Sequence, residues 1–175
     1  MPFIRHVLTL LITCNAVSIS AEENSKCQSK LFDRFIKVEK TGYKLPNRLP
    51  DEELQERMGE FEILCPWQVE IDFNNDQQRD WVGLVAKDNA TVLLAYISGV
   101  GNYKSTIVKQ YTGFPRETHF DYMPVQEAAL MSKKKFPEGK KARFALIENK
   151  IGKPSTIYIW NGESMVRFDD FKGSY

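Results

Sequence analysis

The chain is poor in the side chains that most metal and catalytic centres use. Its 175 residues include only 3 cysteines and 2 histidines. A structural zinc site needs clustered Cys and His ligands, so this composition argues against one. The formal net charge is +1, which argues against nucleic acid as the main partner. Beyond the N-terminal region no apolar run approaches the ~20 residues of a transmembrane helix, so no membrane span is expected.

The N-terminal residues have the pattern of a secretory signal peptide. Arg5 precedes the apolar run Val7–Ile12, and the small residues of Ser18–Ser20 suit cleavage near Ala21. We therefore expect residues 1–21 to be a signal peptide. Residues 22–175 are expected to form one domain, located in the periplasm or outside the cell.

Cleavage near residue 21 would remove Cys14 and leave one pair of cysteines. In an exported chain, two cysteines without another partner are expected to form a disulfide, here between Cys27 and Cys65. Closing this loop would restrict the unfolded chain by about 4 kcal/mol in the chain-entropy model.

Helical patterns come first in the domain, and strand patterns follow. The apolar residues within 31–36 have helical spacing, and Asp51 is suited to cap a second, short helix. Residues 124–132 fit either a strand or a short helix, with the helix slightly favoured. Alternating or short apolar segments predict strands at 67–73, 81–87, 91–97, 104–111, 143–147, 156–160 and 164–168. This order predicts an α+β fold in which N-terminal helices pack on a mainly antiparallel β-sheet.

The stretch DFNNDQQRDW, residues 72–81, gathers oxygen-bearing side chains on alternate positions directly before a strand. Calcium takes several hard oxygen ligands, and a turning loop can supply them from alternate residues. The ligands would be the side chains of Asp72, Asn74, Asp76 and Asp80, together with the carbonyl oxygen of Gln78. A polar turn, in which Asn74 and Asp76 bond nearby backbone amides, accounts for the same residues. A weak calcium site and a polar turn are both open interpretations.

The spacing D-x-N-x-D-x-x-x-D before an apolar strand resembles the calcium loops of FG-GAP/VCBS-type repeat proteins. The resemblance covers Glu70–Val85. Small exported bacterial proteins of uncharacterised function are similar in having one such loop and a final hairpin like residues 156–168. The resemblance implies calcium as a cofactor. The chain departs from the pattern at Gln77, where glycine is usual, and at Arg79, a cation within the proposed ligand shell.

Two further groups of residues are candidates for contact with a protein or glycan partner. The loop SGVGNY resembles the Ser-Gly-x-x-Tyr loop of bacterial periplasmic lysozyme inhibitors, with one extra residue. That resemblance implies that Ser98 and Tyr103 enter a hydrolase cleft; a plain hairpin turn is the alternative. Tyr158 and Trp160 share one face of a strand, where they either bind a partner or pack under a helix.

Catalysis has little support in the sequence. His119 is the single histidine of the expected mature chain, and Glu117 and Asp121 alternate with it, but no Ser or Cys nucleophile motif accompanies them. We therefore expect that the protein is not an enzyme. The sequence favours an exported binding or interaction protein with a weak structural calcium site. The alternative is a periplasmic inhibitor or immunity protein against a cell-wall hydrolase or a secreted toxin.

Overall fold

The protein is built mostly from β-strands. The structure is a computed structural model that describes residues 27, 29–39, 41–47, 50–60, 65–132 and 142–171. The first sheet contains β1 (Gln68–Ile71), β2 (Asp80–Lys87), β3 (Ala90–Ser98) and β4 (Tyr103–Tyr111). The second contains β5 (Thr118–Pro124), β6 (Phe144–Lys150), β7 (Ser155–Trp160) and β8 (Met165–Phe171). The described helices are α2 (Lys30–Glu39), α3 (Glu52–Glu60) and α4 (Val125–Ser132).

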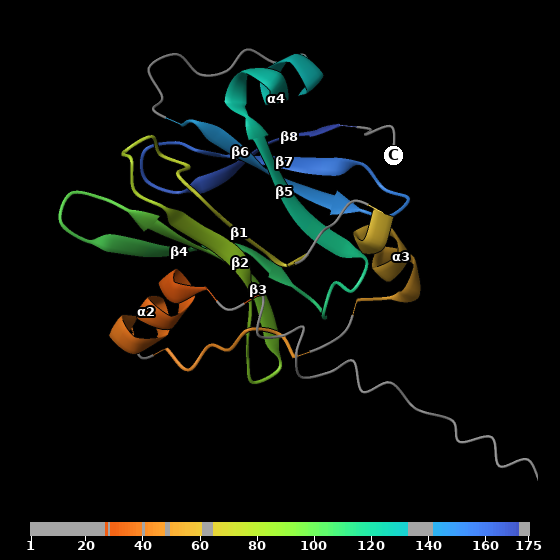
Figure 1. The fold of residues 1–175 in the computed structure, drawn as a ribbon, viewed down its shortest axis with the longest axis horizontal. Helices are drawn as coiled ribbons and strands as arrows, with labels where there is room; N and C mark the ends of the chain where they lie inside the picture. The colour runs from red at the N-terminus through yellow and green to blue at the C-terminus, as the bar shows by residue number, and fades with distance from the viewer. Residues whose placement is uncertain are drawn as a thin grey trace, which may run out of the picture.

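The two sheets are antiparallel and pack against each other around one shared core (Figure 1). In each sheet the strands lie in the order of the chain. β1 lies against β5, and β4 lies against β8. Alternate residues of a strand face opposite sides, so Leu84 and Leu93 of the first sheet and Leu146 and Trp160 of the second meet in this inter-sheet core.

Helix α2 covers the outer face of the first sheet. Ser29 caps it, because its hydroxyl oxygen accepts the backbone N–H of Phe32 at 3.2 Å. The ring of Phe32 lies 5.1 Å from that of Trp81, and the ring of Phe35 lies 5.2 Å from that of Tyr96. These aromatic contacts place α2 on the side of the sheet opposite the inter-sheet core.

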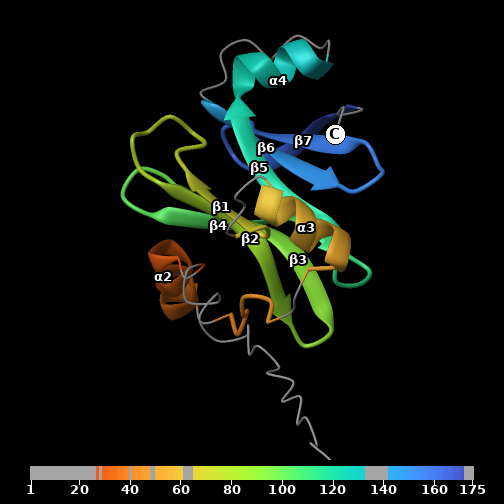
Figure 2. The same ribbon diagram turned by 45° about the vertical axis from the view of Figure 1, so that its right-hand side comes forward.

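The other two described helices lie elsewhere. Val125 and Ala128 of α4 pack on Ile157 and Ile159, on the outer face of the second sheet. Helix α3 lies beside the N-terminal end of β5 (Figure 2). The predicted N-cap of α3 is confirmed, since a carboxylate oxygen of Asp51 accepts the N–H of Leu54 at 2.8 Å.

The predicted α+β fold, with N-terminal helices packed on one sheet, is therefore wrong. The strands divide between two sheets, and the three described helices occupy separate places. The reason is that β3 and β7 bury side chains on both faces, so each sheet needs a cover on its two sides. A helix over 124–132 is present as α4, and β5 is a strand that the sequence did not indicate. The predicted signal peptide, 1–21, lies outside the described residues.

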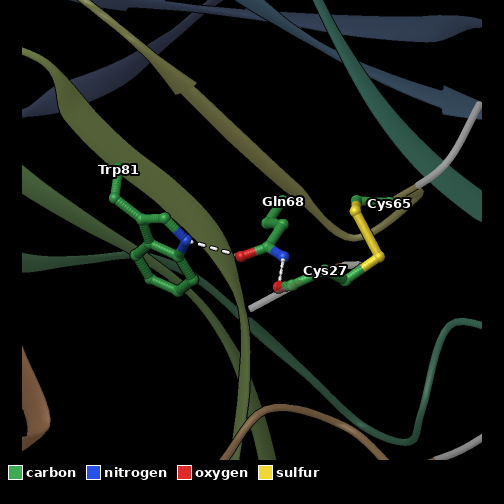
Figure 3. The surroundings of a disulfide bond; sticks show 4 residues. All are labelled: Cys27, Cys65, Gln68 and Trp81. Carbon is green, nitrogen blue, oxygen red and sulfur yellow. Dashed lines mark hydrogen bonds between the residues drawn. A yellow bond between two sulfur atoms is a disulfide. The ribbon is translucent and has the colours of Figure 1, made fainter. Parts of the chain in front are cut away.

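The predicted disulfide between Cys27 and Cys65 is confirmed, with the two Cα atoms 5.4 Å apart. The amide nitrogen of Gln68 donates to the carbonyl oxygen of Cys27, and its amide oxygen accepts from the indole N–H of Trp81 at 2.7 Å (Figure 3). The segment leading into α2 is thus attached covalently to Cys65, just before β1, and by a hydrogen bond to Gln68 of β1. A disulfide suggests an oxidising, non-cytoplasmic compartment. In the described part of the chain no helix is long and apolar enough to cross a membrane.

The carboxylate of Glu148, on β6, is fully buried between the sheets. Both of its oxygens lie 2.7 Å from Lys109 Nζ, and it also accepts the hydroxyls of Tyr158 at 2.7 Å and Tyr111 at 3.0 Å. Lys150 Nζ approaches to 3.4 Å. Burial alone would raise the pKa of Glu148, but the hydrogen bonds from Lys109 and Tyr158 and the nearby ammonium charges hold it below its usual value. The buried charge therefore connects strands of both sheets.

We predict that Glu148→Gln lowers the free energy of unfolding by about 3–5 kcal/mol, because it leaves Lys109 without its counter-charge between the sheets. Lys150→Met is the matched control. The contact of Lys150 with the carboxylate is longer, and in this variant Glu148 keeps its bonds from the other three donors, so the cost should be about 1 kcal/mol or less. Urea denaturation of both variants measures the difference. Equal losses in the two variants would contradict the assigned role of Glu148.

Candidate functional site

The loop between β1 and β2 is turned by the side chain of Asp72. Its two carboxylate oxygens accept the backbone N–H groups of Asp76 and Gln77, each at 3.1 Å. Asn75 and Gln77 have φ angles of 61° and 69°, in the left-handed region that favours glycine. Gln77 therefore adopts a conformation that glycine takes without strain, at a cost of roughly 1 kcal/mol.

Asp80 attaches this loop to the end of β3. Its carboxylate is fully buried and accepts the N–H of Phe73 at 2.7 Å and the N–H and hydroxyl of Ser98 at 2.7 and 2.6 Å. Burial raises the pKa of Asp80, against the lowering effect of the hydrogen bonds from Ser98 and Phe73. A buried acceptor with three donors holds its neighbours in fixed positions.

The hairpin between β3 and β4 is joined to the loop by the same group of side chains. Asn74 Nδ2 donates to the carbonyl oxygen of Ser98 at 2.7 Å, and Ser98 Oγ lies 3.0 Å from Asp76 Oδ1. Gly101, with φ at 81°, makes the tight turn at the hairpin tip. Residues 72–80 and 98–103 thus form one rigid unit, called here the paired loops.

Ser98 and Tyr103, the residues predicted to enter a hydrolase cleft, have supporting positions instead. Ser98 is 3% exposed and bonded to Asp80. The ring of Tyr103 stacks on Tyr96 at 4.7 Å beneath the guanidinium of Arg34, and its hydroxyl donates to a backbone carbonyl of the loop at 3.0 Å. These two residues hold the paired loops in shape, whereas Val100 at the tip of the hairpin is exposed.

The predicted calcium ligands Asp72, Asn74, Asp76 and Asp80 lie near one another, but each is already bonded within the protein. Asp76 Oδ1 accepts the N–H of Gln78 at 2.9 Å, and Asp76 Oδ2 lies 3.2 Å from Asn74 Nδ2. Among the described residues, no group of three or more His, Cys, Asp or Glu side chains is placed to hold a metal ion. Carboxylate and amide oxygens are hard ligands of the kind that calcium prefers. Their hydrogen bonds within the protein, however, favour the polar turn. Calcium binding remains a prediction.

Arg79, the cation within the proposed ligand shell, is directed elsewhere. Its guanidinium lies 3.6 Å from the carboxylate of Glu70, and its side chain is largely exposed. The positive charge is therefore paired with an acid of β1 rather than with the carboxylates inside the loop.

Several exposed side chains surround the paired loops. Val100, at the hairpin tip, is fully exposed. On the other side, Arg143 donates its N–H to the carbonyl oxygen of Phe73 at 2.9 Å, and its guanidinium lies 5.2 Å from the ring of Phe144. Tyr122 meets Phe144 edge to face at 5.5 Å and is about half exposed. We call the surface formed by Asp76, Gln78, Arg79, Val100, Asn102, Tyr122 and Arg143 the loop face.

Tyr158 and Trp160, the other predicted contact residues, lie inside the protein. They are 3% and 8% exposed and belong to the inter-sheet core, while Ile157 and Ile159 on the opposite face lie under α4. Both faces of β7 are covered, which leaves the aromatic pair no surface on which to bind a partner.

His119 is part of a polar chain rather than a nucleophile pair. Its Nε2 lies 3.2 Å from Asn149 Nδ2, and Asn149 Oδ1 accepts the hydroxyl of Ser155 at 2.7 Å. Asp121 accepts a backbone N–H of its own strand at 2.7 Å. Glu117 lies before β5 and contributes its carbonyl oxygen to a turn with Ile151. The three residues are not brought together as an acid, base and nucleophile.

Two groups of residues were missed in the sequence. The acid Glu148 continues the alternation of Phe144 and Leu146 on an apolar face, which is a signal for a buried charge. The grouping of Tyr122, Arg143 and Phe144 has no signal in local spacing, because it depends on the pairing of β5 with β6. In comparisons with known proteins, no family model, no curated protein and no solved structure matches this chain.

We predict that Asp80→Asn lowers the free energy of unfolding by about 3 kcal/mol, because an amide N–H₂ would meet buried backbone donors that need an acceptor. Asp76→Asn serves as the control. Its side chain is exposed, so the cost should stay below about 1 kcal/mol. Chemical denaturation followed by tryptophan fluorescence measures both. A loss at Asp80 no larger than that at Asp76 would show that the paired loops do not depend on the buried carboxylate.

Proposed function

We propose that the protein is an exported binding protein that contacts a protein partner through the loop face. Export is supported by the disulfide, since such bonds persist in oxidising compartments. The observation that carries the binding proposal is the fully exposed Val100 on a hairpin that the buried Asp80 holds rigid. An apolar side chain presented on a rigid support loses little entropy when a partner covers it.

The chemistry of the loop face supports a protein partner. Tyr and Arg are enriched at the residues that dominate binding energy in protein interfaces, and Tyr122 and Arg143 are both present here. Exposed amides such as Asn102 and Gln78 provide adaptable hydrogen bonds at the rim. Loops held by a rigid β-scaffold are common places for such a surface.

A second candidate is an inhibitor or immunity protein against a cell-wall hydrolase or secreted toxin. The shape of the hairpin favours it. Gly99 and Gly101 carry no side chains beside Val100, so the tip is narrow and projects a single apolar group. A narrow convex tip suits a concave enzyme cleft better than a flat surface.

The proposed interface can be tested with a photo-crosslinking amino acid at position 100. Position 38 is the matched control, because Val38 is 61% exposed on α2 and is not part of the loop face. We expect a defined crosslinked partner from position 100 in the exported protein fraction of the native host, and none from position 38. Val100→Asp should weaken binding of that partner at least tenfold. Identical products from both positions would contradict the assignment, and a hydrolase inhibited by the protein would favour the second candidate.

We also propose that the loop of residues 72–80 binds calcium weakly, with a dissociation constant of about 10⁻⁴ to 10⁻³ M as in extracellular modules. At 10 mM calcium the folded state should gain about 1.4–2.7 kcal/mol, since the ion binds the folded chain preferentially. The melting temperature should therefore rise in the wild type and in Glu163→Ala, an exposed acid outside the loop, but not in Asp76→Ala. Equal melting temperatures of the wild type with calcium and with chelator would contradict calcium binding.

A further inference from the structure

Both cysteines of the disulfide are hydrogen-bonded to a single residue of β1, Gln68. The backbone N–H of Gln68 donates to the carbonyl oxygen of Cys65 at 3.4 Å, and its side-chain amide donates to the carbonyl oxygen of Cys27. Figure 3 shows this amide between Cys27 and the indole ring of Trp81. The backbone of each cysteine is therefore held by the same residue, independently of the bond between the sulfur atoms.

The side-chain amide of Gln68 has one orientation that satisfies both of its partners. Its oxygen accepts the indole N–H of Trp81 at 2.7 Å, and Trp81 is fully buried in β2. The indole N–H can only donate, and the carbonyl oxygen of Cys27 can only accept. The amide oxygen must therefore face Trp81, which directs the amide N–H₂ group to Cys27.

The chain next to each cysteine has further attachments to the sheets. Directly after Cys65, the carbonyl oxygen of Pro66 accepts a backbone N–H of β5 at 2.7 Å. Shortly after Cys27, the hydroxyl of Ser29 donates to the carboxylate of Glu70 in β1 at 2.8 Å. None of these hydrogen bonds involves a sulfur atom, so reduction of the disulfide leaves every one of them available.

We propose that the folded protein keeps the thiols of Cys27 and Cys65 aligned after reduction, with Gln68 as the positioning residue, so that the pair is reduced and re-oxidised without unfolding. Both cysteines are partly exposed, which gives a small thiol or disulfide in solution access to them. Their Cα atoms lie 5.4 Å apart, a separation that a disulfide spans without movement of the backbone.

Re-oxidation by a small-molecule disulfide, such as glutathione disulfide, takes two exchange steps. One protein thiolate attacks a sulfur of glutathione disulfide and releases one glutathione thiolate. The second protein thiolate attacks the protein sulfur of this mixed disulfide, forms the protein disulfide and releases the second glutathione. The protein loses two electrons, which reduce glutathione disulfide to two thiols. Alignment favours the second, intramolecular step, because closing the bond then orders little further chain.

The proposal is tested by the equilibrium of the protein with reduced and oxidised glutathione, which measures the effective concentration of one protein thiol at the other. Cys14→Ser in every preparation leaves only the proposed pair of thiols. Gln68→Met should lower the effective concentration about three- to tenfold, the effect of losing one hydrogen bond that orders Cys27 before the bond closes. In concentrated urea the variant and the wild type should agree, because alignment depends on the folded sheet.

Gln55→Met is the matched control. It removes a side-chain hydrogen bond to the carbonyl oxygen of Pro50, 2.8 Å long, from within the same disulfide-closed loop. The effective concentration should stay unchanged in this variant. A second measurement uses Cys27→Ser together with Cys65→Ser, which removes the disulfide. The NMR signal of the Trp81 indole N–H should keep its position in this double variant, because Gln68 still supplies its acceptor.

Three results would overturn the proposal. The first is an effective concentration in Gln68→Met equal to that of the wild type, and the second is an equal fall in Gln55→Met. The third is an unfolded double serine variant, or a shifted Trp81 signal in it, because the surroundings would then depend on the disulfide. If Gln68→Met does not fold, Gln68→Glu replaces it. Its carboxylate still accepts the indole N–H but cannot donate to Cys27, so the same fall is expected, and an unchanged value would count equally against the proposal.

Discussion

The buried charge of Glu148 is the constraint on which the arrangement of the two sheets depends. A carboxylate with no exposure to water is tolerable only if donors surround it, and its donors come from both sheets. Lys109 and Tyr111 can reach it only if β4 lies against the second sheet at one register. Apolar packing alone tolerates small shifts between sheets, whereas this network does not.

A second buried carboxylate acts at the opposite end of the first sheet. Asp80 meets Ser98 where β3 pairs with the first residue of β4, while Lys109 lies opposite Leu93, several residues further along the same pair of strands. One acid therefore positions the two sheets, and the other positions the paired loops at their edge. Because the two networks are separate, the loop face can vary in its exposed residues without disturbing the contact between the sheets.

Local patterns in the sequence were enough for most elements and not for their arrangement. The strand segments around Trp81, Thr91 and Thr156 and the N-cap at Asp51 were predictable, because alternation and capping act over a few residues. The division into two sheets was not, since periodicity does not say which strands pair. Tyr158 and Trp160 of β7 were expected either to bind a partner or to pack under a helix. In the structure both faces of β7 are buried, one in the inter-sheet core and the other under α4. At the candidate site, the oxygen-rich loop was visible in the sequence, but the burial of Ser98 depends on its partner Asp80, 18 residues away.

The covalent and polar attachments also determine which parts of the molecule are free to move. The disulfide attaches the start of the segment 27–65 to its end at Cys65, and Gln68 attaches it to β1. Aromatic contacts hold α2 on the first sheet. Between these anchors and Cys65, α3 has a single buried side chain. A movement there is confined by the closed loop and does not open either core cluster of the first sheet. The paired loops are firmly bonded at the other end of that sheet, so the surface that we propose meets a partner is separate from α3.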